Sequence, residues 1–470
     1  MRRRQAGFTL IEITVALVAG LVVAIGIVGL SKEATRTFHE EVRNAAAEAT
    51  VRTGIDRLTA DLSRAGYMST ANIQLDLMTP NDPGTKYYTT ILTTLPGLRN
   101  LASIRYSDPA DPTNASPAPG KSLPNTPLSL QQPTTLAPDC IDIGGNFSSS
   151  EQFEVMRIIS PAGTAQVGVA PAGGCQQILL SYTSSAIYRI AQGDPKTSTT
   201  GDLALRNVFQ PTPAANGSQF IVRIIDDTLR AQFVATCATA QAAGIINGQP
   251  YLWIDSTKTP LMMQGVPNRV GGLNGSGSGA FLNAVQVVRY EITRPGVTND
   301  AEPAQYGAAL GNAAAGGAPA ADPAKYDLMR SFVDVFGKIV PETSEVVAEY
   351  AVDFKVAFSV DTGLTPGGSI ISAYALDDTG SNSPYATSLT TANQGPQRIR
   401  SVRARLTTRT AVADRKVNIP LAPANYGNQE FMYRYCIAAN GCTGTTALQW
   451  ARARTVTTEV SLPNQMRDFW

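Results

Sequence analysis

The residues with the clearest chemical potential lie at the start of the chain. Gly7 and Phe8 follow three arginines, and Glu12 lies four residues beyond Phe8 inside an apolar run. A carboxylate in a membrane segment costs about 2.5–3.5 kcal/mol on insertion scales, so it requires a partner. Cleavage between Gly7 and Phe8 would create an ammonium group on Phe8, which could serve the Glu12 of a neighbouring copy or a related chain. The spacing therefore indicates an assembly device.

Five cysteines, an odd number, form the second chemically distinctive set. Cys436 and Cys442 enclose a short turn-like loop that ends in Asn-Gly, and we expect them to form a disulfide because the protein is exported, as argued below. Cys140 and Cys175 flank a candidate strand region and form the next expected pair, which leaves Cys237 free or buried. The alternative is that all five are small buried apolar residues.

Residues for enzymatic chemistry are scarce. The single histidine, His39, falls on a charged helical segment, and the chain has no phosphate-binding glycine loop and no Cys-x-x-Cys pair. Arg400, Arg403 and Arg405 could suggest a phosphate site, but we interpret them as a solvated sheet face. The segment 108–114 has the carboxylates of a calcium loop but lacks its glycine, so we predict an exposed loop. We expect no enzyme activity, no cofactor and no metal.

The apolar run extends from Phe8 to Leu30 and contains one charged residue, Glu12. A helix of this length reaches roughly 34 Å, enough to cross a bilayer core of ~30 Å. The three leading arginines place the N-terminus in the cytoplasm by the positive-inside rule, so the rest of the chain is exported. No clean signal-peptidase site follows the run, which predicts that the helix is retained.

Helical periodicity continues beyond the membrane segment. Apolar residues recur at spacings of three and four up to Ala65, and no proline occurs before Pro80. We predict one helix from about Phe8 to Arg64, which Gly66 ends. Its charged outer face includes Asp61.

The remainder is predicted to be rich in loops and strands. Charged residues make up only 16% of the chain, and the net charge of +1 gives no electrostatic case for nucleic acid. Predicted strands cover Tyr87–Leu92, Leu101–Tyr106, Gln152–Ile159, Gln177–Tyr182, Ala186–Ile190, Gln219–Ile225, Ala231–Ala235, Ala284–Thr293, Phe354–Val360, Ile399–Leu406 and Ala451–Leu462. A short helix is predicted over Ser344–Asp353. A helix followed by many such strands favours an α+β fold.

The segment from Gly7 to Glu12 resembles the class III signal of type IV pilins and type II secretion pseudopilins. The resemblance implies cleavage after Gly7 by a prepilin peptidase, N-methylation of Phe8 and retention of the apolar helix as a filament stem. Residues 1–68 and 345–462 further resemble PilW-type minor pilins, although Ser63 replaces the arginine usual at its position in that family.

These observations lead to a pilin-like α+β fold, in which a long N-terminal helix packs on an antiparallel sheet with large loop insertions. The expected function is that of a minor pilin that primes a type IV pilus at or near its tip. A minor pseudopilin of type II secretion is the first alternative, and a membrane-anchored hydrolase or binding protein the second.

Expected partners are the prepilin peptidase, the major pilin, other minor pilins and a PilY-type tip adhesin. Before assembly the chain is expected in the inner membrane with a single span, and afterwards in a cell-surface pilus. The expected segments are 1–7 (leader), 8–30 (membrane helix), 31–65 (amphipathic helix), 66–138 (proline-rich loops), 139–343 (β-rich head) and 344–470 (C-terminal sheet).

Overall fold

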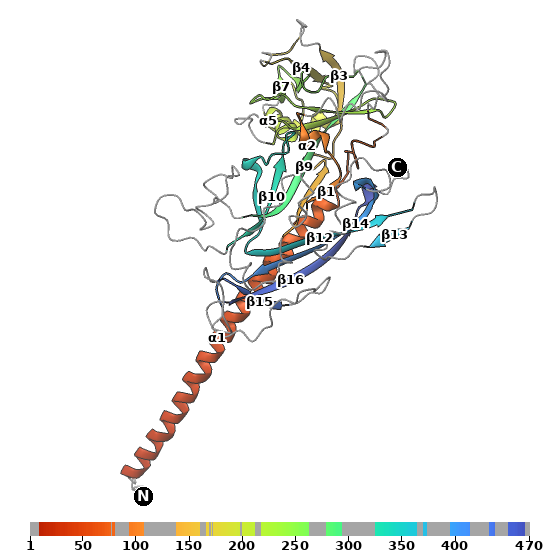
Figure 1. Ribbon diagram of the computed structural model, residues 1–470. Helices are drawn as coiled ribbons and strands as arrows, with labels where there is room; N and C mark the ends of the chain where they lie inside the picture. The colour runs from red at the N-terminus through yellow and green to blue at the C-terminus, as the bar shows by residue number, and fades with distance from the viewer. Residues whose placement is uncertain are drawn as a thin grey trace.

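A long helix and two antiparallel sheets make up the structure (Figure 1). The computed structural model describes residues 9–76, 78–79, 94–107, 138–159, 166–168, 171, 173–197, 200–211, 218–262, 279–293, 325–363, 370–373, 395–413, 432–437 and 450–465. The predicted strand Tyr87–Leu92, the 108–114 segment and most of the proline-rich region lie outside these residues.

Helix α1 runs without interruption from Leu10 to Leu62, over 53 residues. At about 1.5 Å per residue it is about 80 Å long. Thr9 caps its first turn, Ser63 is its C-cap residue, and residues 63–68 form turns. Gly66 has a φ of +73°, and its N–H donates to the carbonyl of Gly144 at 2.8 Å, which ties the end of the helix to a strand. The predicted continuous helix is confirmed.

The described strands form two sheets. The first has the order β1-β2-β9-β3-β4-β8-β7, with β10 and β5 also paired to β9, β11 paired to β10, and β6 paired to β5. Its strands are β1 (Ile104–Ser107), β2 (Cys140–Gly145), β3 (Phe153–Ile159), β4 (Cys175–Leu180), β5 (Ile221–Ile225), β6 (Ala231–Ala235), β7 (Ala243–Ile246), β8 (Gln249–Asp255), β9 (Phe281–Thr293), β10 (Asp327–Val333) and β11 (Glu345–Ala348). The second has the order β13-β12-β14-β16-β15, with β12 (Ala351–Asp361), β13 (Ile371–Ala373), β14 (Ile399–Arg409), β15 (Met432–Cys436) and β16 (Trp450–Ser461).

The C-terminal half of α1 shares one hydrophobic core with both sheets. Val51, Leu58 and Leu62 are fully buried in a cluster that contains Ile141 and Val288 of the first sheet and, from the second sheet, Phe354, Val402 and Leu406. A Cβ at Gly54 would lie only 2.9 Å from the Leu406 side chain and 3.1 Å from that of Ala348. The glycine therefore permits close packing of α1 against these two side chains. The prediction that Val402, Ala404 and Leu406 of β14 face the core is confirmed.

Asp61 does not lie on a charged outer face, so that prediction was wrong. Its carboxylate is buried and accepts hydrogen bonds from the Tyr290 hydroxyl at 2.7 Å and from Arg330 Nε at 2.6 Å. Asp61 is three residues after Leu58, which places it on the apolar stripe of the helix. Its position in the periodicity was therefore the available signal, and the polar residue type obscured it.

A distal lobe is inserted in the hairpin that β2 and β9 form. Gly145 pairs with Gln286, and the lobe comprises the chain between these two residues. Its core contains residues of β3, β4, β5, β6, β8 and the start of β9, together with those of helices α4 (Ser185–Ile190) and α5 (Thr200–Phe209). Figure 1 shows β3, β4 and β7 at the end of the molecule farthest from the N-terminus. The insertion thus extends the head away from the stem.

Two predictions of secondary structure were wrong. The predicted strand Ala186–Ile190 is helix α4, because the Ser184 hydroxyl accepts the Ile187 N–H and caps a helical turn. The predicted helix Ser344–Asp353 is instead β11, a turn and the start of β12. Pairing with β10 and β14 decides this conformation, and Tyr350 makes the turn with a φ of 55°.

The outer face of β14 is only partly solvated. Arg405 is buried and forms an ion pair with Asp353 at 3.0 Å, whereas Arg403 and Arg400 are more exposed and pair with Glu459 and Asp361. The prediction of a solvated face is therefore wrong for Arg405, because a carboxylate from the neighbouring strand compensates its charge in the interior.

Candidate assembly segment

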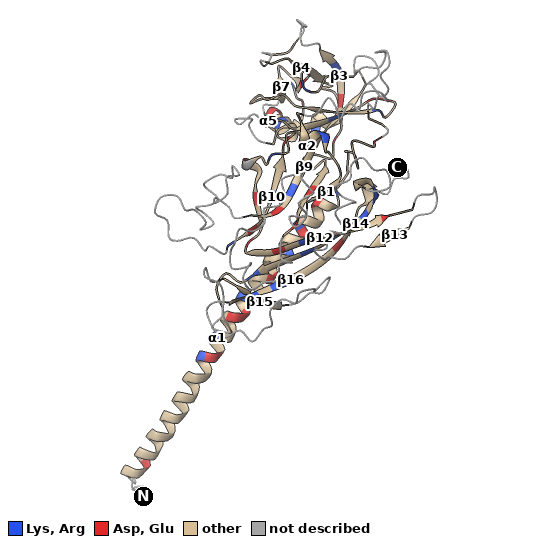
Figure 2. Ribbon diagram, in the orientation of Figure 1, with Lys and Arg blue, Asp and Glu red and all other residues tan. Residues whose placement is uncertain are grey.

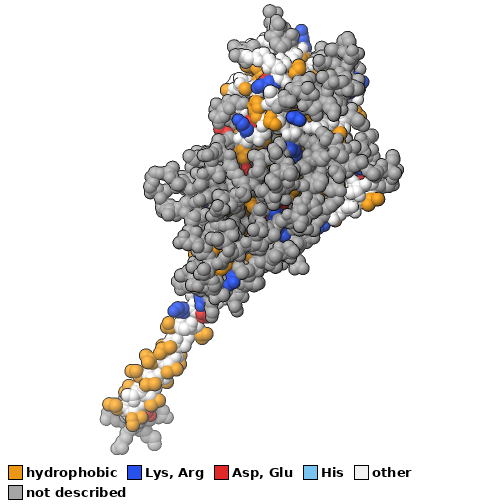
Figure 3. Space-filling view, viewed as in Figure 1, with side chains coloured by type: hydrophobic (Ala, Val, Ile, Leu, Met, Phe, Trp, Pro, Cys, Tyr) orange, Lys and Arg blue, Asp and Glu red, His pale blue; other side chains and the backbone are white. Residues whose placement is uncertain are grey.

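The N-terminal part of α1 presents a long apolar surface without internal partners. From Leu10 to Leu30 every residue is exposed, with Leu10 at 80% and Leu30 at 74% exposure. Figure 3 shows apolar side chains along this projecting stem. Among the described residues, α1 is the one helix apolar and long enough to cross a membrane. A surface of this kind requires lipid or the stems of other subunits around it.

Glu12 is the only charged residue between Leu10 and Leu30, as Figure 2 shows near the N-terminal end of the stem. Its carboxylate accepts the Thr9 backbone N–H and the Thr9 hydroxyl, each at 3.0 Å, while the Glu12 N–H donates to the Thr9 hydroxyl at 3.3 Å. This capping box directs the carboxylate toward the first turn of the helix. Glu12 is therefore held against Thr9, and Gly7 and Phe8 lie outside the described residues.

Charged residues return where the helix meets the head. Glu40 and Glu48 of α1 lie 3.3 Å from Arg452 and Arg454 of β16. Partly exposed pairs of this kind contribute about 0–1 kcal/mol each, so they orient the helix while the buried core holds it. The C-terminal half of α1 is thus joined to the head by the buried core and, at its edge, by these ion pairs.

The cysteines are paired differently from the prediction for Cys140 and Cys175. Cys175 forms a disulfide with Cys237, with Cα atoms 6.1 Å apart, and Cys140 is free and buried. Cys175 opposes Asp255 of β8, and the Cys237 N–H donates to Trp253 of the same strand, so β8 brings the two cysteines together.

Strand order also explains why the predicted pair cannot form. The order β2-β9-β3-β4 places two strands between Cys140 and Cys175. At about 4.8 Å per strand spacing this separates β2 and β4 by roughly 14 Å, more than a disulfide can span. Cys436 takes part in a disulfide. Cys442 lies outside the described residues, so its pairing with Cys436 stays a prediction.

The remaining candidate groups do not converge on a site. His39 is exposed on α1, with its ring 6.1 Å from that of Phe38. Among the described residues, no cluster of three histidine, cysteine, aspartate or glutamate side chains is placed to hold a metal. The structure thus assigns no chemistry to these residues.

The comparisons with known proteins bear on the stem. A family model of the prokaryotic N-terminal methylation motif matches residues 2–28. The chain carries a class III prepilin signal. No curated protein and no solved structure matches the chain.

The prepilin signal fits the structure that follows it. An apolar helix continuous with antiparallel sheets is the α+β arrangement of pilins. A signal of this class implies processing by a prepilin peptidase, anchoring in a membrane and assembly with other pilins. Signal and fold together support a protein of the type IV pilin or pseudopilin type.

Proposed function

We propose that the protein is a minor pilin of a type IV pilus, which primes assembly and remains at or near the tip. The observation that carries the proposal is an exposed apolar stem, with the prepilin signal at its start, built as one helix with a large two-sheet head. The stem is suited to the inner membrane before assembly and to a filament core afterwards.

The size of the head supports a position at the tip. The roughly 400 residues after α1 correspond to a radius of gyration of about 21 Å if compact. Packed helices lie only about 8–10 Å apart. A subunit repeated along a filament core would crowd such heads, whereas a subunit at the end has free space on one side.

The charge of Glu12 supports the presence of a neighbouring subunit in the filament core. Its carboxylate is the one charge in the apolar stem, and a buried carboxylate is stabilised by an opposite charge. The methylated ammonium group of Phe8 on an adjacent subunit is the expected partner. The other proposed partners are the major pilin, further minor pilins and a PilY-type adhesin.

The test is mass spectrometry of sheared surface filaments. We expect the mature protein in them, beginning at N-methylated Phe8. Glu12→Ala and Glu12→Gln should be processed normally but enter filaments poorly, because both variants lose the charge. Glu33→Gln, on the exposed face of the same helix beyond the apolar run, is the matched control and should behave as wild type.

Two outcomes would contradict the proposal. A Glu12→Ala protein that enters filaments at the wild-type ratio would remove the reason given for this carboxylate. A deletion strain that keeps its pili but loses type II secretion would instead identify a minor pseudopilin, which has the same signal and stem.

A further inference from the structure

Among the described residues two lysines are buried, and one of them lies against a buried aspartate. Lys355 of β12 and Lys325 are both less than a tenth exposed, although lysine is rarely buried unless it is paired. The side chains of Lys355 and Asp139 are 2% and 1% exposed, and the Lys355 Nζ lies 3.1 Å from the Asp139 Oδ1. This contact joins two parts of the chain that are 216 residues apart.

The backbone of β12 holds the Asp139 carboxyl group in one orientation. Asp139 immediately precedes β2, and its backbone N–H donates to the Phe354 carbonyl at 2.7 Å. Its Oδ2 accepts the Val356 N–H at 2.8 Å. Backbone groups on both sides of Lys355 therefore bind the aspartate, and its Oδ1 contacts the lysine amine.

The charges around this contact come in two pairs. Arg405 of β14 lies opposite Lys355 in the strand ladder and forms an ion pair with Asp353 at 3.0 Å. All four side chains are buried, and charges in the interior carry a large desolvation cost. Proton transfer from the Lys355 Nζ to the Asp139 Oδ1 gives a neutral amine and a neutral acid. It removes one positive and one negative charge, so the pair of Asp353 and Arg405 stays balanced.

The neutral pair has the geometry for condensation to an amide. Reacting groups held about 3–3.5 Å apart in a folded site have effective molarities up to ~10⁵–10⁸ M. The Nζ lone pair attacks Cγ of Asp139 and forms the N–C bond, and the Val356 N–H stabilises the negative charge that develops on Oδ2. The bond between Cγ and Oδ1 then breaks. Oδ1 leaves as water with the acid proton and one amine proton, and the third hydrogen of the original ammonium group stays on the amide nitrogen.

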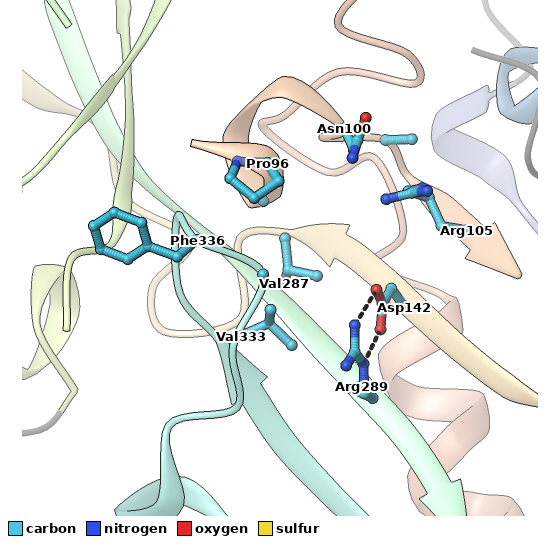
Figure 4. A pocket seen from close by; sticks show the side chains of 11 residues that line it. Pro96, Asn100, Arg105, Asp142, Val287, Arg289, Val333 and Phe336 are labelled. Atoms are coloured by element: carbon cyan, nitrogen blue, oxygen red, sulfur yellow. Dashed lines mark hydrogen bonds and ion pairs between the residues drawn. The ribbon is translucent and has the colours of Figure 1, made fainter. Parts of the chain in front are cut away.

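Asp142, three residues further along the chain, shows the contrast with an ordinary buried ion pair. Both of its oxygens accept hydrogen bonds from Arg289, from Nε at 2.7 Å and from Nη2 at 2.9 Å, at the wall of a small cavity (Figure 4). A guanidinium group stays protonated in proteins, so it does not act as a nucleophile. Of these two aspartates, Asp139 alone contacts an amine.

We propose that Lys355 and Asp139 condense to an amide bond between their side chains, with release of one water molecule. The bond would join the segment that leads into β2 of the first sheet to β12 of the second sheet. The distal lobe lies within the loop that it closes, and closure of so long a loop restricts the unfolded chain. The proposal concerns a modification of the head and does not depend on the assembly role of the stem.

The test is mass spectrometry of the full chain, purified in detergent and kept folded at neutral pH until its mass is constant. After reduction and denaturation, we expect a mass one water molecule below that of the polypeptide. Trypsin should not cleave after Lys355 and should release a branched peptide that contains both residues, in which fragmentation locates the bond. Lys325, whose Nζ lies 3.7 Å from the Asp327 Oδ2, is the internal control and should be cleaved normally.

Variants test the assignment of residues. Lys355→Arg keeps a cation but lacks the nucleophilic amine, so it should have the full mass of its polypeptide. Lys338→Arg, which replaces an exposed lysine, is the matched control and should keep the loss of one water. The proposal is overturned if the wild-type protein has its full mass and is cleaved after Lys355. It is also overturned if the water is lost by cyclisation of an aspartate within a linear peptide, and neither result depends on the folding of a variant.

Discussion

The buried contact of Asp61 is the sharpest point at which to test how the helix is held to the head. Its carboxylate receives hydrogen bonds from Tyr290 at 2.7 Å and from Arg330 at 2.6 Å, and both side chains of the ion pair are 7% exposed. Burial and the Asp61 carboxylate raise the pKa of Tyr290, so its hydroxyl stays a donor. Burial opposes the charge of Arg330, but the hydrogen bond to Asp61 raises the pKa of that guanidinium.

Removal of the carboxylate should be costly, because it leaves Arg330 charged in the interior. Loss of one partner of a buried pair destabilises a protein by about 3–5 kcal/mol, so we expect Asp61→Ala to fall in this range. Asp61→Asn retains an acceptor for Tyr290 and should cost about 1.5–3 kcal/mol. Glu345, which lies 3.4 Å from Arg330, is 46% exposed and compensates only weakly.

The assay is denaturant unfolding of the full chain in detergent, followed by tryptophan fluorescence. Trp450 is buried in β16, against which α1 packs, and reports the loss of this sheet. Asp56→Asn, an exposed carboxylate on the same helix, is the control and should change the free energy of unfolding by less than about 0.5 kcal/mol. An Asp61→Ala protein as stable as this control would refute the argument that the ion pair holds the helix.

Three further predictions concern other parts of the chain. Burial raises the pKa of Asp327 to about 6 from 3.8, so the folded state binds more protons between these values and stability falls as pH rises through this window. Asp327→Asn keeps the acceptor for the Tyr350 N–H, and it should remove roughly 3 kcal/mol of the pH dependence of the free energy of unfolding. The measurement compares the free energies of unfolding of the wild type and the variant from pH 4 to 7. Parallel curves of free energy against pH would contradict the prediction. Replacing Cys175 and Cys237 together with alanine opens a loop of 62 residues and should lower the free energy of unfolding by about 4 kcal/mol, whereas Cys140→Ala should leave the disulfide intact in a non-reducing peptide map. Gly7→Ala should reduce prepilin cleavage because the added side chain crowds the peptidase site, and immunoblots that show full processing would argue against that reading of the junction.

Properties that depend on nearby residues were predictable from the sequence. The apolar run, its lone carboxylate and the basic leader are features of consecutive residues, and they identified the membrane stem and the prepilin signal. The spacing of Val51, Ile55, Leu58 and Leu62 likewise predicted a helix with one buried face. The alternation in β14 predicted which side faces the core. Helical and strand periodicity are local properties, so no knowledge of distant contacts was needed.

Partners far apart in the chain were decided only by the tertiary structure. Cys175 forms a disulfide with Cys237 because β8 lies beside both cysteines. The strand order that brings them together cannot be deduced from the spacing of cysteines in the sequence. Asp61 is buried because Tyr290 and Arg330, more than 200 residues away, supply its hydrogen bonds. The segment Ser344–Asp353 had a pattern compatible with a helix, but ladder hydrogen bonds to β10 and β14 made it extended. In each case the free energy of a long-range contact outweighs a local preference of a few tenths of a kcal/mol per residue, and that contact exists only once the sheets have assembled.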